Sequence, residues 1–325
     1  MIRADLSGRL ANSLFRELWQ NYRGQVSDVP RIEDALRALG EFWHEDHVAF
    51  RTLPGEHCGA HVLQGMFELL GYQRRDSYEF KDKRLSAFWM EPPSDKGTLA
   101  HLVLPKVFIS ELQVEMFTSQ FCSCVKKYTN QVHSSPLAEW KSQFNQLTRS
   151  LDFSNTEDSE RSLFESLKAS MVAYLSEGPG WQRPMFTDYQ LLLRESEYGA
   201  WTLVFGPIPN HFTVSVYLMK RFSSLDSFNE FVTEHLAVRM NQAGGQIIKG
   251  SPLVGLEQSA TLACHVPVLF QDGVRRLPYA FVEFAFRHPL EGNCADGQWG
   301  SYYQGFVTEN ADKIFESTYV NVRQP

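Results

Sequence analysis

The sequence predicts an α+β fold built from two βαβββ modules, whose curved sheets surround a shared site. The same order of strand, helix and three strands occurs twice along the 325 residues, over 46–112 and again over 206–290. Each copy also opens on a strand in which a histidine begins a polar face that is backed by an apolar one. We expect one compact domain in which helical segments pack around the two modules.

Two amphipathic helices are expected before the first module, within residues 1–45. The first shows leucines at helical spacing, at Leu6, Leu10, Leu14 and Leu18. The second follows Pro30, a residue type favoured at the first helical position, and carries Ile32, Leu36 and Leu39. Residues 1–45 therefore form an N-terminal helical segment.

The first module, 46–112, begins with a short strand at 46–52. A helix is expected over 58–70, because Gly71 stands where glycine favours a helix end. Strand patterns follow over 72–80, 85–91 and 99–112. The last of these should be broken near Pro105, because proline cannot donate to a strand ladder.

A mainly helical insert and linker, 113–205, separates the two modules. Its clearest helical patterns cover 137–151 and 160–175. We interpret this insert as a cap or packing layer.

The second module, 206–290, repeats the order of the first. A strand is expected over 211–218 and a helix over 226–242, ended by two glycines. The further strands cover 246–250, 259–270 and 279–287, with Asp272-Gly273 as the turn between the last two. Residues 291–325 should form a C-terminal segment that packs on the core.

Composition narrows the class of protein. Hydrophobic residues make up 43% and charged residues 21% of the chain, the balance of a globular enzyme. The net charge of -7 argues against nucleic acid as a partner, because phosphate binding needs a concentrated basic surface. No stretch approaches the roughly 20 apolar residues of a membrane span, and the first residues lack the apolar run of an export signal. The composition does not indicate an oligomeric state.

Five scattered cysteines favour a reducing compartment. They are Cys58, Cys122, Cys124, Cys264 and Cys294. An odd number without a pair of Cys-x-x-Cys clusters is atypical of a disulfide framework or a structural zinc site. We therefore expect free thiols and a cytoplasmic location.

Candidate functional residues lie on the first strand of each module. His47, Ala49 and Arg51 share one face of their strand, because alternate side chains of a strand point the same way. His211 similarly begins the polar face of the strand that opens the second module. Equivalent positions in two curved sheets that face each other would bring the two histidines together.

A carboxylate in an apolar strand completes the candidate set. Glu283 lies within Tyr-Ala-Phe-Val-Glu-Phe-Ala-Phe, where a buried charge is costly unless it is paired or bound to a metal. Two imidazoles and one carboxylate are the ligands of facial iron(II) sites. Arg51 beside such a site would suit a substrate carboxylate, because an arginine binds carboxylates through two parallel hydrogen bonds.

Several of these residues also have structural interpretations. A single histidine in a strand is commonly a hydrogen-bonded structural group, and Arg51 would then pair with Glu45 or Asp46. Glu111 is the rival carboxylate, since it stands near the end of the first module as Glu283 does in the second, and it is a candidate outer partner of the metal ligands.

Another pair of histidines has metal-binding spacing. His57 and His61 lie four residues apart at the start of a predicted helix, a spacing that can bind zinc. The acidic residue of the metalloprotease motif does not follow the first of them. We therefore give this pair a lower rank than His47, His211 and Glu283.

Four segments of the chain resemble the 2-oxoadipate dioxygenase/decarboxylase family. They are Asp-His-Val-Ala-Phe-Arg-Thr, Lys-Val-Phe-Ile-Ser-Glu-Leu, Gly-Leu-Glu-Gln-Ser-Ala-Thr and Tyr-Ala-Phe-Val-Glu-Phe-Ala-Phe-Arg. The resemblance spans most of the chain and is weakest over the helical insert. It implies a core similar to the vicinal oxygen chelate fold, Fe(2+) held at His47, His211 and Glu283, and a substrate carboxylate bound by Arg51.

The resemblance also implies an activity. Such an enzyme converts a 2-oxo dicarboxylic acid and O2 into a 2-hydroxy acid and CO2, with 2-hydroxyglutarate as the product from 2-oxoadipate. Gln258 and Ser259 are candidate pocket residues, because they begin the strand next to that of Glu283. Four aromatic residues of the C-terminal segment have two interpretations, packing of that segment, which we favour, or closure of the site: Trp299, Tyr302, Tyr303 and Phe306.

Two other classes of function stay open at this point. One is a glyoxalase-like isomerase or lyase of the same fold, in which zinc, nickel or manganese would replace iron; these metals would also compete for the site in purified protein. The other is a carboxylate-binding module without catalysis. Oxygen uptake separates the first class from a dioxygenase, and turnover separates the second.

Overall fold

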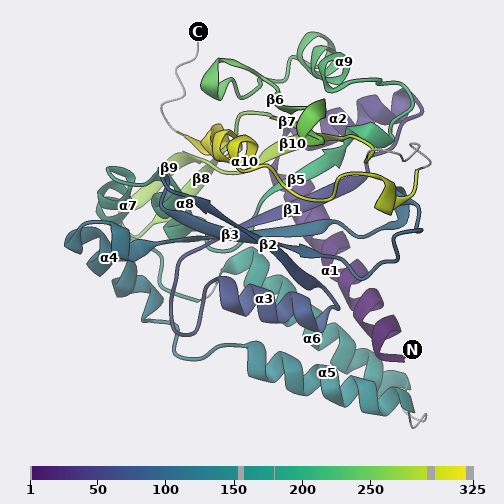
Figure 1. Cartoon of the computed structure of the whole chain (residues 1–325). Helices are drawn as coiled ribbons and strands as arrows, with labels where there is room; N and C mark the ends of the chain where they lie inside the picture. The colour runs from purple at the N-terminus through teal and green to yellow at the C-terminus, as the bar shows by residue number, and fades with distance from the viewer. Residues whose placement is uncertain (1, 153–156, 179, 291–296, 320–325) are drawn as a thin grey trace.

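The protein folds around one curled, eight-stranded sheet, shown in the computed structural model of Figure 1. The structure describes residues 2–152, 157–178, 180–290 and 297–319. The strand order is β2-β3-β4-β1-β5-β10-β7-β6. Strands β1 (Glu45–Thr52) and β5 (Pro209–Ser215) pair antiparallel at its centre. The α+β class with two βαβββ modules is confirmed, and the two expected sheets are halves of one sheet joined edge to edge.

The first module has the expected order of elements. Strand β1 is followed by a helix and three strands: α3 (Ala60–Leu69), β2 (Gln73–Phe80), β3 (Leu85–Glu91) and β4 (Lys106–Leu112). The break before β4 is present, where a short 3₁₀ turn, Ala100–Leu102, precedes Pro105. Strand β4 returns beside β1 and runs parallel to it.

The second module repeats this arrangement from the other side of the central pair. Strand β10 (Phe281–Arg287) runs parallel to β5, as β4 does to β1. Outside β10 lie β7 (Leu256–Ala260) and β6 (Lys249–Ser251), both paired antiparallel. The two modules therefore have the same strand order counted outward from the centre.

One predicted strand of the second module was wrong. The segment 259–270 divides: β7 ends at Ala260, and β8 (His265–Phe270) pairs with β9 (Gly273–Pro278) in a separate two-stranded sheet. The turn at Asp272-Gly273 exists, but it joins β8 to β9 rather than to the last strand. Residues 261–264 leave the main sheet, so the hairpin is an insertion within the module.

The helix predicted over 226–242 is also much shorter. Helix α9 spans Leu225–Glu230 and continues into one π-helical turn, Phe231–His235. Ala237 then has a φ of 48°, a left-handed conformation that ends a helix. The apolar residues beyond it are buried as irregular chain, because Val238 and Met240 pack into the core without helical structure.

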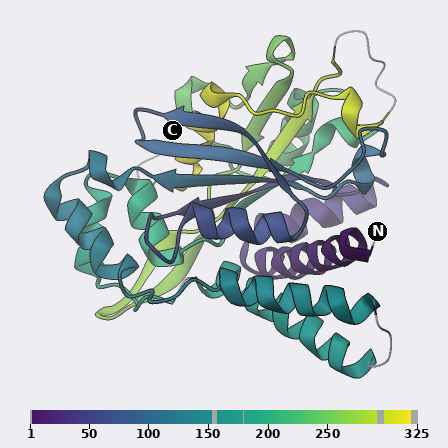
Figure 2. The same ribbon diagram turned by 60° about the horizontal axis from the view of Figure 1, so that its bottom comes forward.

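Helices cover one face of the sheet, as Figures 1 and 2 show for α1, α3, α5 and α6. Two helices precede the first module as predicted, α1 (Ile2–Gln25) and α2 (Asp28–Ala38). The described part of the insert contains five α-helices: α4 (Ser119–Thr129), α5 (Leu137–Asp152), α6 (Glu157–Glu177), α7 (Phe186–Leu193) and α8 (Glu197–Phe205). The larger core lies between helices α1, α3, α5 and α6 and the even-numbered side chains of β1, β5 and β10, such as Phe50, Phe212 and Phe284.

The opposite face of the sheet is covered by the C-terminal segment. Helix α10 (Thr308–Ile314) and the 3₁₀ turn Phe315–Thr318 lie over it, on the far side from α3, α5 and α6 (Figure 1). A second core forms there, in which Ala49 and Phe108 meet Phe306 and Phe315. The C-terminal segment thus packs on the core as predicted for 291–325, within its described part, 297–319. No helix among the described residues is long and apolar enough to cross a membrane.

Candidate metal centre

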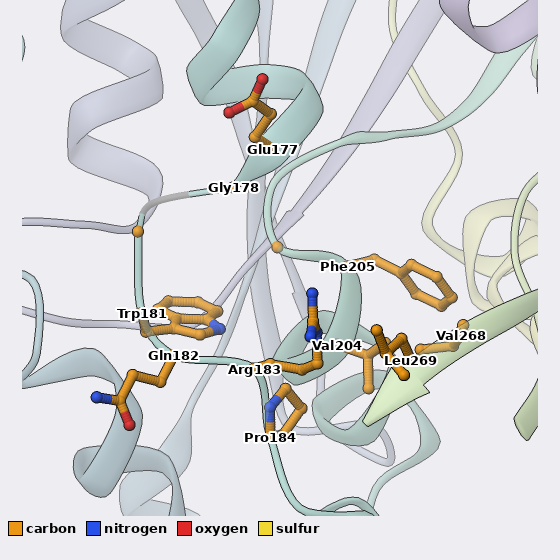
Figure 3. A pocket seen from close by; sticks show the side chains of 12 residues that line it. Glu177, Gly178, Trp181, Gln182, Arg183, Pro184, Val204, Phe205, Val268 and Leu269 are labelled. Atoms are coloured by element: carbon orange, nitrogen blue, oxygen red, sulfur yellow. The ribbon is translucent and has the colours of Figure 1, made fainter. Parts of the chain in front are cut away.

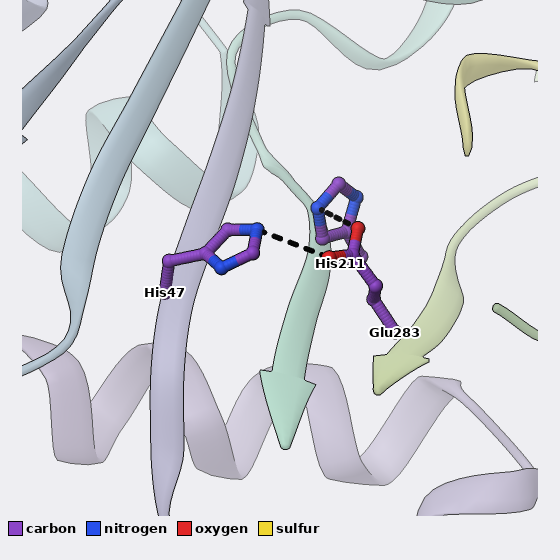
Figure 4. Close-up of side chains that lie close together, drawn as sticks. All are labelled: His47, His211 and Glu283. Atoms are coloured by element: carbon purple, nitrogen blue, oxygen red, sulfur yellow. Dashed lines mark ion pairs between the residues drawn. The ribbon is translucent and has the colours of Figure 1, made fainter. Parts of the chain in front are cut away.

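Three side chains of types that can bind a metal converge on the face of the sheet that the C-terminal segment covers: His47, His211 and Glu283 (Figure 4). The Nε2 atom of His47 lies 3.4 Å from Oε1 of Glu283, and Nε2 of His211 lies 3.1 Å from Oε2. The three ligand atoms lie within 4.8 Å of one another, and all three side chains are buried. This separation is that of groups arranged around a single ion.

Strand register explains why these residues meet. Ala49 pairs with His211 across β1 and β5, and Thr213 pairs with Glu283 across β5 and β10. Odd-numbered side chains of all three strands point to the same face, because side chains alternate along a strand. His47, His211 and Glu283 are therefore neighbours on three adjacent strands, although up to 236 positions separate them in the sequence.

Both imidazoles have their second nitrogen engaged on the side away from the centre. Nδ1 of His47 lies 2.8 Å from the Asp46 carboxylate, and Nδ1 of His211 lies 3.3 Å from Oδ1 of Asn210. Such partners favour a proton on Nδ1 and leave Nε2 as the ligand atom. The donor set and its orientation therefore fit a divalent metal, with two nitrogen ligands and one carboxylate.

Electrostatics keep Glu283 ionised in a buried place. Burial alone would raise the pKa of Glu283, but the nearby imidazoles of His47 and His211 and the Gln258 amide lower the pKa below its usual value. Burial lowers the pKa of His211, against the opposing effect of Glu283. An anionic carboxylate beside a neutral imidazole is the state in which both can bind a metal.

Gln258 holds the Glu283 carboxylate from the neighbouring strand. Its Nε2 donates a 2.6 Å hydrogen bond to Oε1 of Glu283, and its own Oε1 accepts from Asn310 on α10. Gln258 therefore lies in the pocket as predicted. Ser259 does not: the next residue on a strand faces the other way, and its hydroxyl donates to Asn229 of α9. The prediction of Ser259 as a pocket residue is corrected.

A small cavity adjoins the three ligands. It is about 20 Å³ in volume, room for about one water molecule. Its walls are mostly apolar, formed by the sheet and the C-terminal segment: Ala49, Phe108, Phe306, Ala311, Ile314 and Phe315. The ring of Phe306 stands edge-on to His47, with centroids 4.8 Å apart. Of the C-terminal aromatic residues considered for packing or site closure, Phe306 lines the cavity, whereas Trp299 and Tyr302 pack in a separate cluster with Ala100.

Arg51 lies two positions beyond Ala49 on the same face of β1 and is almost fully buried. Its guanidinium stacks against Tyr198 and Trp201 of α8 and Phe315, with carbon-to-centroid distances of 5.0–5.6 Å. It donates to Thr318 Oγ1 (2.9 Å) and to the carbonyl of Phe315 (3.2 Å).

The buried charge of Arg51 is not used in an ion pair with Asp46. Burial lowers the pKa of Arg51 to about 10, so it stays cationic at neutral pH. Nε has no hydrogen-bond partner. The Glu197 carboxylate acts on the charge of Arg51 electrostatically, whereas Asp46 pairs with Lys106 and Arg287 instead. The alternative pairing with Glu45 or Asp46 is therefore not found. Two aromatic rings of α8 pack against Arg51. Through this helix the insert therefore contacts a candidate site residue.

The sequence reasoning missed a buried ion pair behind His47. Arg287, at the end of β10, makes two hydrogen bonds to the Asp46 carboxylate, at 2.6 and 2.8 Å. Burial would raise the pKa of Asp46, but Arg287 and Lys106 lower it well below its usual value. Burial lowers the pKa of Lys106 to about 7. The signal for Arg287 was present in the sequence, since it is a charge at the end of the same apolar strand that carries Glu283.

Glu111 is not part of the site. Its register partner on β1 is Thr52, on the face opposite to His47, and its Oε2 accepts from Thr52 Oγ1 and from the backbone N–H of Ala60. The residue that corresponds to Glu283 in the first module is Phe108, because Phe108 pairs with Ala49 as Glu283 pairs with Thr213. Glu111 instead caps the N-terminus of α3.

Replacing Glu111 by alanine should therefore destabilise the fold without affecting metal binding. We expect a loss of about 1–2 kcal/mol in the free energy of unfolding, because the first N–H of α3 loses its acceptor. Urea unfolding measures this loss, and Glu68→Gln on the exposed side of α3 is the control, with an expected change within about 0.5 kcal/mol. A fall in metal affinity of Glu111→Ala would restore it as a site residue.

The structure does not support a zinc site at His57 and His61. His61 is exposed and His57 lies 3.8 Å from Glu56, and no second group of three metal-binding side chains occurs within the described ranges. Cys58, Cys122, Cys124 and Cys264 are free thiols, as expected, and Cys294 lies outside the described residues.

A larger hollow of about 250 Å³ lies elsewhere, between the insert and the β8–β9 hairpin (Figure 3). Its side chains include Glu177, Arg183 and Trp181, together with apolar residues of α8 and β8. None of its twelve described lining residues is a histidine, cysteine or aspartate. This hollow has none of the chemistry of the metal centre.

Comparisons with known proteins agree with one another. A family model described as 2-oxoadipate dioxygenase/decarboxylase matches residues 15–294. The chain is 32% identical to the chloroplastic/amyloplastic 2-oxoadipate dioxygenase/decarboxylase of Oryza sativa, over 97% of this chain and 81% of that protein. It is 34% identical to the chloroplastic enzyme of Arabidopsis thaliana, over 84% of this chain and 68% of that one.

Solved structures show the same relationship. The hydroxyglutarate synthase of Oryza sativa, crystallised with 2-oxoadipate, superposes with a TM-score of 0.76 at 29% identity, over 98% of this chain and 94% of that chain. A glyoxalase superfamily protein of Ralstonia eutropha superposes with a TM-score of 0.73 at 22% identity, over 92% and 86% of the two chains. The second likeness concerns the fold alone.

Proposed function

Because the chain belongs to the 2-oxoadipate dioxygenase/decarboxylase family, we propose that it is an oxidoreductase that decarboxylates a 2-oxo dicarboxylic acid with O2. One observation carries the proposal at the level of the site. His47, His211 and Glu283 converge on a small cavity, and Arg51, a buried cation whose Nε has no hydrogen-bond partner, contacts Phe315 of the cavity wall. A metal-binding centre next to a carboxylate-binding residue is what a 2-oxo acid requires.

Iron(II) is the metal we propose for His47, His211 and Glu283. Two imidazoles and one carboxylate on one side of an ion are the ligand set of non-haem iron(II) oxygenases. When bound there, iron supplies open coordination positions at which a 2-oxo acid and O2 react. Gln258 keeps the Glu283 carboxylate oriented toward this position through its 2.6 Å hydrogen bond.

Arg51 would bind one carboxylate of the substrate. An arginine forms two parallel hydrogen bonds to a carboxylate, and the unpaired Nε together with one Nη offers such a pair. With 2-oxoadipate, which the similar rice protein binds, one carbon leaves as CO2 and 2-hydroxyglutarate remains, with both atoms of O2 in the products. The aromatic rings of Phe108, Phe306 and Phe315 exclude water from this reaction.

The C-terminal segment must move before such a substrate can enter the site. A cavity with room for about one water molecule cannot hold a six-carbon diacid. Phe315 and Thr318 both accept hydrogen bonds from Arg51, and Phe315 also lines the cavity. Movement of this 3₁₀ turn would free both the space and the hydrogen-bond donors of Arg51.

Oxygen uptake on a panel of substrates tests the proposal. Protein loaded with iron(II) without air is mixed with 2-oxo acids of four to seven carbons, with and without a second carboxylate, and O2 consumption and CO2 release are measured. We expect equal amounts of O2 consumed and CO2 released, with a six-carbon diacid among the best substrates. Absence of both signals for every acid would contradict the proposal.

The same experiment separates the alternatives. Turnover that persists without O2 and with zinc, nickel or manganese would indicate the glyoxalase-like isomerase or lyase. Binding of the acids without turnover would indicate a carboxylate-binding module. The cytoplasmic location inferred from the cysteines stays a prediction, because both plant relatives are named as chloroplast proteins.

A further inference from the structure

The buried ion pair behind His47 has no role in the proposed function so far. The side chains of Asp46 and Arg287 are completely buried, and that of Lys106 is nearly so. A buried charge pair is costly, and replacement by apolar residues is commonly neutral or stabilising. A role in the metal centre, rather than a contribution to stability, therefore explains why this pair lies next to His47.

Asp46 contacts the metal ligand directly. Its Oδ1 accepts from Nδ1 of His47 at 2.8 Å and from Nη2 of Arg287 at the same distance. A carboxylate on Nδ1 directs the lone pair of Nε2 toward the metal and raises the basicity of the ligand. The corresponding contact of the other histidine is weaker, because His211 meets a neutral amide of Asn210 at 3.3 Å.

Arg287 fixes Asp46 and also positions the cavity wall. Two of its nitrogens, Nε and Nη2, donate to Asp46. The third, Nη1, donates to the carbonyls of Tyr303 and Gly305 at 2.9 and 2.8 Å. The next residue is Phe306, whose ring lies 5.4 Å from the guanidinium carbon and stands against His47.

Lysine could not replace Arg287 in this arrangement. The guanidinium joins three separate segments, since it lies on β10, bonds to β1 and bonds to the loop 303–305. A planar fork with five donors makes these contacts in fixed directions, whereas an ammonium group has three donors and a compact charge.

We propose that Asp46 and Arg287 are positioning residues of the metal centre. Arg287 fixes the Asp46 carboxylate, and Asp46 fixes the ring of His47 so that Nε2 faces Glu283 and His211. The same guanidinium holds Phe306 against the outer side of that ring. This inference rests on the proposed metal site and concerns how tightly the site binds its metal.

Metal affinity of isosteric variants tests the inference. Dissociation constants for manganese(II), a stand-in for iron(II) that is stable in air, are measured by calorimetry for the wild type, Asp46→Asn and the double variant Asp46→Asn/Arg287→Gln. The double variant leaves no unpaired charge of this pair. We expect both to bind about 10- to 100-fold more weakly, the usual effect of losing an outer partner. Asp188→Asn on α7, which removes a carboxylate from a pair with Lys127 of α4, is the matched control and should bind as the wild type does.

A measurement on the wild type covers the case in which both variants fail to fold. Nitrogen-15 spectra of histidine-labelled, zinc-loaded protein should show a protected, strongly downfield Nδ1 proton for His47, as a hydrogen bond to a carboxylate produces. Folded variants with metal affinity within twofold of the wild type, or absence of that proton, would overturn the inference. A wild type that binds no metal would instead overturn the proposed function.

Discussion

Replacing Glu283 by glutamine is expected to lower the affinity for iron(II) by more than ~100-fold, because loss of an outer partner alone costs about 10- to 100-fold. Oxygen consumption with 2-oxo acids should fall in parallel. The change removes one negative charge and little volume, and Gln258 still finds an acceptor in the new amide oxygen. The fold should therefore survive, since the buried carboxylate is the costly group in this apolar strand.

Anaerobic titration with iron(II) followed by an oxygen-electrode assay measures both effects. Glu111→Gln is the matched control, because it makes the same chemical change on the face of the sheet that turns away from the site. Unchanged iron affinity in Glu283→Gln, with thermal unfolding like that of the wild type, would exclude Glu283 as a ligand. A parallel loss in the Glu111 variant would point to a general effect of charge.

Replacing Arg51 by lysine should lower kcat/KM for 2-oxo diacids by about 10- to 100-fold, the effect of one hydrogen bond between charged groups worth about 1.5–3 kcal/mol. Lysine keeps a positive charge but cannot form the two-pronged pair with a carboxylate. The metal ligands are untouched, so iron affinity should stay within about twofold of the wild type. Arg74→Lys on the exposed strand β2 is the control and should have unchanged kinetics.

The same variant identifies which carboxylate Arg51 binds. Rates are compared for 2-oxoadipate and for 2-oxohexanoate, which has the same chain length but lacks the distal carboxylate. If Arg51 binds the distal group, only the diacid loses kcat/KM in Arg51→Lys. If it binds the group next to the keto carbon, both acids lose it equally. Unchanged kcat/KM for both would remove Arg51 from the substrate site.

The faces of the strands could be predicted from the sequence because alternation is a local property. His47, His211 and Glu283 each stand among apolar residues that occupy the alternate positions, and those neighbours are buried in the larger core. Since a strand has two faces, burial of one set sends the other set to the opposite face. Once the side chains share a face, they lie close together if their three strands are neighbours in the sheet.

The register between neighbouring strands could not be predicted from the sequence in the same way. Glu111 was matched with Glu283 because both lie late in their modules, yet the parallel register pairs Phe108 with Ala49. A shift by an odd number of residues moves a side chain to the other face of the sheet. The prediction that Ser259 lies in the pocket was wrong for a related reason, because its neighbour Gln258 takes the position that faces Glu283.

Four features could be predicted from the sequence alone: the α+β class, the two βαβββ modules, the polar face of each opening strand, and the charge of Glu283 in an apolar strand. Each of these follows from patterns within a few residues. Two other features become visible only in the folded protein: Arg287 bonds to Asp46, 241 positions away, and Thr318 and Phe315 contact Arg51. Such contacts depend on how distant segments pack, and buried polar groups take whichever partner that packing brings within hydrogen-bond distance.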